Sequence, residues 1–343
     1  MEYVTLNKVV MYISVPSHDI DYKVMVRCAT YNHSKYIQET LNGFSIQETN
    51  FPFICIVVDD ASTDGNREVI RRYANDNCDM STVEISEDDI SKYIRVSHKT
   101  NANCFFLFCL LKVNLYGKPE KKEIYKPYRA VCEYEAPCEG DDYWIDPLKL
   151  QKQVDFLEKN PDCGLVYGRA KEFLQDKGKF GILIGGKATS FEDIFFKGNP
   201  VPTLTACYRA KIVNEYRENM QLPKFAMGDL PIWLYISKHY SIHFIDEVLG
   251  VYRVLKNSAS GRISYDARLR FIQSSFDVRQ FFCDYYKLPY MNSLDEFKAR
   301  VYYLAAKEFS KIEDMRKHYV CVKNKLSIKE RIVHYLYMLG ILG

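Results

Sequence analysis

The sequence lacks the signatures of several large classes of protein. No Cys-x-x-Cys pair and no group of histidines marks a zinc site, and the eleven cysteines are scattered without paired spacing. This pattern favours reduced thiols in a cytoplasm over a disulfide framework. No Gly-x-Gly-x-x-Gly follows the first expected strand, which argues against a nicotinamide-dependent dehydrogenase.

Long hydrophobic runs are also absent. The longest, Phe105 to Leu111, is far shorter than the roughly 20 residues that a membrane-spanning helix needs. The N-terminal segment has no basic stretch followed by a long apolar run, so we expect no signal peptide. With 343 residues, 47% of them hydrophobic and 27% charged, the chain has the composition of a globular protein of about two domains.

The first part of the chain alternates between strand-like and helix-like segments. Residues 23–28 and 53–58 are short apolar runs rich in β-branched residues, as in buried parallel strands. Helical patterns follow each of them, in residues 37–44 and 62–73. This order predicts an α/β fold with a mostly parallel sheet covered by helices.

Polar residues follow each of the expected strands. They are Thr30, Tyr31 and Asn32, then Asp59 and Asp60, and finally the motif Glu139-Gly140-Asp141-Asp142-Tyr143-Trp144, which comes after a strand-like stretch at 130–138. Ligands bind beyond the carboxyl ends of parallel strands, so we expect these residues to meet at one rim. Taken singly, each Asp is equally well explained as a helix cap or turn former, but their coincidence favours a site.

The motif at 139–144 indicates a metal. Three carboxylates within four positions repel one another, and burying them unpaired costs several kcal/mol, on the order of 1–4 or more. Mg²⁺ or Mn²⁺ resolves the conflict, since such a cation commonly sits between one or two carboxylates and substrate phosphates. A solvated acidic turn is the alternative for this motif alone.

Three blocks, residues 29–47, 54–65 and 138–158, resemble in order and spacing the inverting glycosyltransferases of family 2, which have the GT-A fold. The motif at 139–144, followed by an Asp-Pro-initiated helix, is typical of the bacterial polysaccharide branch of that family. The resemblance covers roughly residues 22–262 and implies a catalytic domain at 1–262. A helical C-terminal region would then occupy 263–343.

The resemblance implies a nucleotide site at the first two strand ends. Thr30, Tyr31 and Asp60, with Asn32 and Asp59 beside them, would hold the base and ribose. The Tyr31 ring offers a stacking face worth ~1–3 kcal/mol. A carboxylate can accept a hydrogen bond from the uracil N–H or from a ribose hydroxyl.

The metal motif and a later arginine complete the implied donor site. Asp141 would bind the cation directly, Glu139 would reach it through water or contact the sugar, and Asp142 and Trp144 would border the donor. Arg253 resembles the family arginine that closes on the diphosphate, for which guanidinium groups are well suited. Core packing for Trp144 and an ion pair for Arg253 are the structural alternatives.

The resemblance also implies a general base. Asp229 matches its position, although relatives usually carry Glu-Asp and this chain has Gly228-Asp229. The alternative for Asp229 is a helix N-cap. Asn199, Thr203 and Thr205 lie in a segment that often borders the acceptor in this family.

The implied activity is inverting transfer of a sugar, from UDP or another nucleotide diphosphate, to a hydroxyl of a growing glycan or lipid-linked saccharide in surface polysaccharide synthesis. A catalytically idle nucleotide-sugar-binding module is the alternative, since Gly228 replaces the usual Glu. Beyond a few lysines, nothing supports nucleic-acid binding.

Two further segments carry expectations of their own. Residues 112–137 look like an insertion. Its charged stretch 118–122 suggests an exposed hairpin or lid, and a loop that simply tolerates length is the alternative. The basic stretch 311–331 leads into the apolar residues 332–342, which suits peripheral contact with the inner face of an anionic cell membrane. The alternative is docking on the catalytic domain or on a second subunit, which would make a homodimer.

Overall fold

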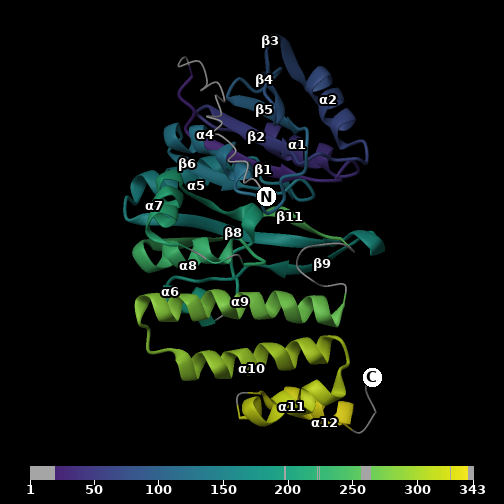
Figure 1. Cartoon of the computed structure of the whole chain (residues 1–343), viewed down its shortest axis with the longest axis vertical. Helices are drawn as coiled ribbons and strands as arrows, with labels where there is room; N and C mark the ends of the chain where they lie inside the picture. The colour runs from purple at the N-terminus through teal and green to yellow at the C-terminus, as the bar shows by residue number, and fades with distance from the viewer. Residues whose placement is uncertain are drawn as a thin grey trace, which may run out of the picture.

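The structure, a computed structural model, describes residues 20–196, 198–221, 223, 225–255, 264–324 and 326–338. Within them, an 11-stranded sheet has the order β3-β4-β5-β2-β1-β6-β10-β8-β11-β7, with β9 paired to β8 (Figure 1). The strands are β1 (Val24–Thr30), β2 (Phe53–Asp59), β3 (Cys78–Glu87), β4 (Ser91–His98), β5 (Cys104–Leu111), β6 (Tyr134–Pro137), β7 (Tyr143–Trp144), β8 (Cys163–Leu174), β9 (Lys179–Ile184), β10 (Cys207–Arg209) and β11 (Ser241–Val254).

The helices lie between and after these strands. They are α1 (Ile37–Ser45), α2 (Asn66–Asn77), α3 (Glu120–Glu123), α4 (Lys126–Val131), α5 (Lys149–Lys159), α6 (Phe191–Phe196), α7 (Ala210–Asn219), α8 (Leu230–His239), α9 (Tyr265–Tyr286), α10 (Met291–Glu308), α11 (Ile312–Val322) and α12 (Ile328–Met338), with short 3₁₀ turns η1 (Gln175–Lys177) and η2 (Thr203–Thr205).

The centre of the sheet is parallel, as expected from the sequence. β1 pairs in parallel with β2 and β6, and β2 pairs in parallel with β5. Every residue of β2 is buried, because helices cover both faces of the sheet at this point. Antiparallel pairs of β3 with β4 and of β10 with β6 and β8 extend the sheet on either side. The α/β class is confirmed.

The segment at 112–137 differs from its expected form. Instead of an exposed hairpin or lid, it folds into α3, α4 and β6. Ile124, Tyr125 and Tyr128 are buried against the face of the sheet opposite to α1, α2 and α5. The charges at 118–122 predict an exposed segment, but the apolar residues that follow them are buried. The segment therefore completes the core of the sheet.

The C-terminal helices stack beyond the sheet, with α9 nearest to it and α11 and α12 farthest away (Figure 1). α9 is part of the same hydrophobic cluster as α8, in which Phe276 and Phe282 join Leu230 and Trp233. The expected boundary at 262/263 lies outside the described residues and stays a prediction. In the described part of the chain, no helix combines the length and apolar character needed to cross a membrane.

Candidate functional site

The three blocks expected at one rim do meet there. Asp60 N–H donates to the carbonyl of Thr30 at 2.9 Å, and Gly140 N–H donates to the carbonyl of Ala29 at 2.9 Å. These two bonds join the ends of β2 and β6 to the end of β1. The arrangement follows from the parallel register, which pairs Thr30 with Asp59.

Gly140 is required by this close approach. A Cβ at position 140 would lie 2.5 Å from the Cβ of Thr30 and 2.6 Å from its hydroxyl oxygen. Real Cβ atoms do not come this close, so any side chain would push the acidic motif away from β1. The glycine explains how Glu139 and Asp141 come to lie beside the first strand end.

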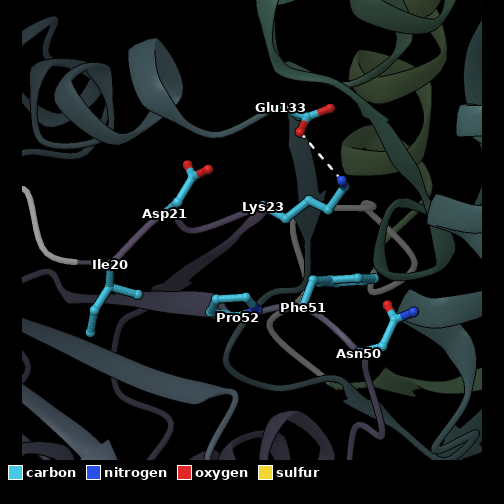
Figure 2. A pocket seen from close by; sticks show the side chains of 7 residues that line it. All are labelled: Ile20, Asp21, Lys23, Asn50, Phe51, Pro52 and Glu133. Atoms are coloured by element: carbon cyan, nitrogen blue, oxygen red, sulfur yellow. Dashed lines mark ion pairs between the residues drawn. The ribbon is translucent and has the colours of Figure 1, made fainter.

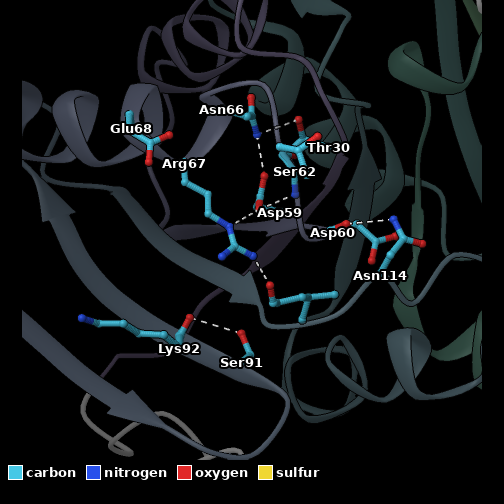
Figure 3. A network of polar contacts seen from close by, with 12 residues as sticks. Thr30, Asp59, Asp60, Ser62, Asn66, Arg67, Glu68, Ser91, Lys92 and Asn114 are labelled. Carbon is cyan, nitrogen blue, oxygen red and sulfur yellow. Dashed lines mark hydrogen bonds and ion pairs between the residues drawn. The ribbon is translucent and has the colours of Figure 1, made fainter.

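Asp59 is a buried anchor. Its carboxylate accepts hydrogen bonds from Asn66 Nδ2 at 2.8 Å, Arg67 Nε at 2.7 Å and Ser62 N–H at 3.2 Å (Figure 3). Asn66 also donates to the Thr30 hydroxyl at 3.3 Å. Because the Asp59 side chain is fully buried, its role in this structure is to hold the loops at the rim.

Asp60 is buried as well, under the segment that follows β5. Its Oδ1 accepts from Leu115 N–H at 2.6 Å, and its Oδ2 pairs with Lys121 Nζ at 2.8 Å. Asn114 Nδ2 donates to its carbonyl at 2.9 Å (Figure 3). The sequence reasoning missed Lys121 as a partner, and the run of charges at 118–122 was the only signal for it.

The first loop presents one residue and uses the next as a link. The Tyr31 side chain is 47% exposed at the rim. Asn32 has a left-handed backbone, with φ of 56°, and accepts a hydrogen bond from Thr63 N–H at 2.8 Å. Its own N–H donates to the Ser62 hydroxyl at 2.9 Å. Tyr31 is thus open to a ligand, and Asn32 joins the first loop to the second.

Glu139 and Asp141 are the partly open carboxylates of the acidic motif, with side chains 40% and 21% exposed. Burial raises the pKa of Glu139, while Arg27 Nη1, 3.6 Å from its Oε1, opposes this shift. His33 Nε2 lies 3.9 Å from Asp141 Oδ2, and the other ring nitrogen of His33 is buried without a hydrogen-bond partner. The sequence reasoning did not single out His33.

These two carboxylates suit a cation whose other ligands come from the substrate and from water rather than from the protein. In the described residues, no group of three or more His, Cys, Asp or Glu side chains is arranged to hold a metal ion. Mg²⁺ is usually held by one or two carboxylates, with substrate phosphates and water as its other ligands. The donor set at Glu139 and Asp141 fits this requirement.

Asp142 and Arg253 hold the motif in place. Arg253 N–H donates to Asp142 Oδ1 at 2.8 Å, and Arg253 Nε donates to the carbonyl of Asp141 at 2.8 Å. The other guanidinium nitrogens bind Gln175 and Glu39, each at 2.6 Å. Burial and the nearby Asp141 hold the pKa of Asp142 well above its usual range. Both side chains are at least 95% buried, so here they support the motif rather than face solvent.

Trp144 differs from its expected place beside a donor sugar. Its ring is 1% exposed and packs edge-on against Phe44, with ring centroids 4.9 Å apart. Its indole N–H donates to the carbonyl of Leu204 at 2.6 Å, and Lys149 Nζ lies 4.1 Å from the ring centroid. The structural alternative, core packing, describes Trp144 in this structure.

Asp229 lies half-buried at the start of α8. Its Oδ1 accepts from Leu230 N–H at 2.8 Å, which is an N-cap contact. Its Oδ2 accepts from Asn199 Nδ2 at 3.0 Å and from the Thr203 hydroxyl at 2.9 Å. The segment expected to border an acceptor therefore contacts Asp229 directly, and one carboxylate oxygen remains only singly bonded.

A cavity of about 410 Å³ lies at the opposite edge of the sheet. Its lining residues are Ile20, Asp21, Lys23, Asn50, Phe51, Pro52 and Glu133 (Figure 2). Lys23 and Pro52 directly precede β1 and β2, so the cavity is at the amino ends of these strands. Ligands of such sheets bind at the carboxyl ends, where the acidic motif lies.

Comparison with known sequences finds similarity to glycosyltransferases over parts of the chain. Residues 26–101 match the profile described as Glycosyl transferase family 2. An uncharacterized protein of Mycobacterium tuberculosis is 33% identical over 150 residues, which cover 44% of this chain and 36% of that protein. The chain thus matches about a third of the length of this relative. The putative teichuronic acid biosynthesis glycosyltransferase TuaG of Bacillus subtilis is 25% identical over 240 residues, which cover 69% of this chain and 81% of TuaG.

Two solved structures share the fold at 16% sequence identity. The mannosyltransferase PcManGT of Pyrobaculum calidifontis, in complex with GDP-Man and Mn²⁺, has a TM-score of 0.54, over 93% of this chain and 81% of that one. S. aureus TarS 1–349, in complex with UDP-GlcNAc, has a TM-score of 0.50, over 93% and 92%. Residues 26–101 therefore match glycosyl transferase family 2, and the chain is similar to TuaG over 240 residues.

Proposed function

We propose that this protein is an inverting glycosyltransferase that moves a sugar from UDP to a hydroxyl of a growing glycan or lipid-linked saccharide. The observation that carries the proposal is the convergence of Thr30, Asp60 and the partly open Asp141 at one rim. Support comes from TarS, which binds UDP-GlcNAc, and from TuaG, which is named for teichuronic acid biosynthesis. Surface polysaccharide synthesis is the process that fits the description of TuaG.

The nucleotide would lie across the first two loops. The exposed ring of Tyr31 stacks on the base, and Thr30 and Asp60 bind the base or ribose. Since Asp60 is 1% exposed and paired with Lys121, this recognition requires Lys121 to move away from the carboxylate. Asn32 and the buried Asp59 keep the two loops in register.

The diphosphate would lie over the acidic motif. Asp141 would hold a Mg²⁺ or Mn²⁺ ion, with Glu139 beside it, and PcManGT in complex with Mn²⁺ supports this choice of cofactor. When bound, the cation stabilises negative charge on the departing diphosphate. Asp142 and Arg253 fix the backbone of the motif from below, which keeps the Asp141 carboxylate aimed at the same place.

Asp229 is the general base in this proposal. It takes the proton from the acceptor hydroxyl as that oxygen attacks the anomeric carbon opposite the leaving group. The bond from the anomeric carbon to the diphosphate oxygen breaks, and its electron pair leaves with UDP. Asn199 and Thr203 orient the carboxylate. Base catalysis of this kind contributes ~10²–10⁴-fold, and the attack inverts the anomeric configuration.

The second candidate is a catalytically idle module that binds nucleotide sugars. Gly228 favours it, because the acidic partner usual in relatives is missing before Asp229. The acidic motif keeps all three of its carboxylates, Glu139, Asp141 and Asp142, so we prefer the enzyme. Turnover separates the two, since an idle module would bind UDP without releasing it from any donor.

The acceptor would be met at the inner face of the cell membrane. Ile328, Ile332 and Tyr335 are 77%, 54% and 58% exposed and occupy one stripe of α12. Lys329 and Arg331 lie on either side of that stripe, which matches the charge of anionic lipid. We propose a membrane surface as the occupant of this face, rather than a second copy of the chain.

The experiment that tests the donor site is release of UDP from a panel of UDP-sugars, with and without Mn²⁺. We expect metal-dependent release from one donor, lost in Asp141→Ala and retained in Asp89→Ala, which removes an exposed carboxylate outside the rim. Release that is equal in both variants would contradict the donor site. UDP binding with no release from any donor would favour the idle module.

A further inference from the structure

A buried arginine of α9 binds the segment that leads to Asn199. Arg279 is 1% exposed, and its guanidinium donates to the carbonyls of Phe195 at 2.7 Å, Gly198 at 2.8 Å and Ile194 at 3.4 Å. A further bond, to the carbonyl of Ser275 at 2.8 Å, stays within α9. Phe195 and Ile194 are in the last turn of α6, where carbonyls lack helical partners.

The chemistry of this contact is unusual. The hydrogen-bond partners of Arg279 among the described residues are all backbone carbonyls, with no carboxylate to balance the charge. Burial lowers the pKa of Arg279 to about 9. The guanidinium carbon lies 5.6 Å from the ring centroid of Phe276 and 5.4 Å from that of Phe297, so aromatic faces enclose it. A buried cation held in this way fixes the carbonyls that surround it.

α9 also holds the second segment that reaches the candidate base. Ala226 N–H donates to the Ser274 hydroxyl at 2.8 Å, three residues before Asp229. Arg279 also binds the carbonyl of Gly198. The next residue is Asn199, whose side chain donates to Asp229. α9 is therefore hydrogen-bonded to both segments that meet at the Asp229 carboxylate, the one that contains Gly198 and the one that contains Ala226.

We propose that α9 positions the general base, with Arg279 as the principal positioning residue and Ser274 as the second. The inference rests on the proposed role of Asp229. It makes the first helix after the expected boundary at 262/263 a working part of the catalytic site. A carboxylate displaced by about 1 Å from its productive place can lose on the order of 10²-fold in rate, although it stays chemically intact.

The test measures kcat for sugar transfer and the affinity for UDP in four variants. Arg279→Met removes every contact to the carbonyls, Arg279→Lys keeps a cation with fewer donors, and Ser274→Ala removes only the bond to Ala226. Arg270→Met replaces an exposed arginine of the same helix and is the matched control. Circular dichroism and thermal melting report whether each variant is folded.

We expect kcat to fall about 10- to 100-fold in Arg279→Met, with partial recovery in Arg279→Lys and a smaller fall in Ser274→Ala, while UDP affinity is unchanged. Arg270→Met should behave as wild type. If Arg279→Met does not fold, the Arg279→Lys and Ser274→Ala variants carry the test. Unchanged kcat in these folded variants, or an equal loss of UDP affinity, would overturn the inference.

Asp229→Asn, measured beside them, separates this inference from the function on which it rests. If Asp229→Asn abolishes transfer and the folded α9 variants do not slow it, only the positioning role fails. If Asp229→Asn transfers sugar at the rate of the wild type, the proposed base fails first, and with it the reason for positioning it.

Discussion

Beneath the rim, a single buried carboxylate is shared between two arginines. Glu135 is 1% exposed and accepts from Arg27 Nε at 2.9 Å, Arg129 Nε at 2.7 Å and the Tyr208 hydroxyl at 2.7 Å. Burial alone would raise the pKa of Glu135, but the charges of Arg129 and Arg27 lower it from 4.5 to about 2. Arg27 also lies 3.6 Å from Glu139, so this network connects the core to the acidic motif.

The stability that Glu135 provides should depend on acid in a defined window. Because its folded pKa is depressed, the contribution is fully present above about pH 4.5 and is lost as the pH falls towards 2. The shift corresponds to about 3 kcal/mol. We therefore expect Glu135→Gln to lower the unfolding free energy at pH 7 by at least about 3 kcal/mol and to flatten its decline between pH 4.5 and 2.

Urea unfolding at several pH values measures this effect. Glu133→Gln is the control, since the Glu133 side chain is 59% exposed and its ion pair with Lys23, at 3.4 Å, lies near the surface. If the unfolding free energy of both variants declined equally between pH 4.5 and 2, Glu135 would not be the source of the acid dependence.

At the scale of elements, the approach of the acidic motif to β1 depends on a missing side chain. Gly140→Ala would place a Cβ 2.5 Å from the Cβ of Thr30, so the motif and the first strand end must separate. Overpacking of this kind costs ~1–3 kcal/mol. If about 1.4 kcal/mol of this cost must be overcome when UDP binds, the affinity for UDP falls about tenfold, which is the result we expect.

Isothermal titration with UDP and Mn²⁺ tests this expectation. Gly186→Ala is the matched control, because a Cβ there meets nothing within 4 Å. Equal UDP affinity in the two variants would contradict the claim that the strand ends and the motif form one site.

The elements that could be predicted from the sequence are those whose pattern is local. The apolar runs of β1 and β2 and the stripes of α1 and α2 are visible in the printed residues, and the α/β fold follows from their order. The same holds for the meeting of the strand ends, since parallel strands carry their carboxyl ends to one edge. Local pattern was therefore enough for the fold and for the position of the rim.

Features that depend on long-range contacts could not be predicted. Nothing near Trp144 indicates that its N–H is taken by Leu204, sixty residues later. The partners of Arg253 are likewise spread from Glu39 to Gln175. In the segment at 112–137 the local pattern is misleading, because the charged residues come first and the buried tyrosines later. The partners of Trp144 and Arg253 are distant in sequence, so no local pattern reports them.

At the scale of the whole molecule, the described chain is elongated, and the strands that carry the rim lie far from α11 and α12. The sheet with its rim forms one end, and α11 and α12 form the other (Figure 1). α9 contacts the segments around Asp229 and so connects the C-terminal helices to the site. This arrangement leaves α12 free to dock on a surface without disturbing the site.

We expect the protein to sediment with vesicles that contain phosphatidylglycerol and not with vesicles of phosphatidylcholine alone, because α12 combines an apolar stripe with cations. The double variant Ile328→Asp and Ile332→Asp should lose this binding. The control is Ile85→Asp, which alters an exposed isoleucine of β3. Unchanged binding of the double variant would contradict the proposal. The proposal would also be contradicted if the wild-type protein dimerised with increasing concentration and the double variant did not.

The measurement that tests the central claim most directly is the rate of sugar transfer by Asp229→Asn, with the donor found in the UDP-sugar panel. Asn is also a good N-cap, so the start of α8 should be preserved while the base is removed. We expect kcat to fall ~10²–10⁴-fold with UDP affinity unchanged. Transfer at the wild-type rate would contradict the assignment of Asp229 and, with it, the proposed mechanism.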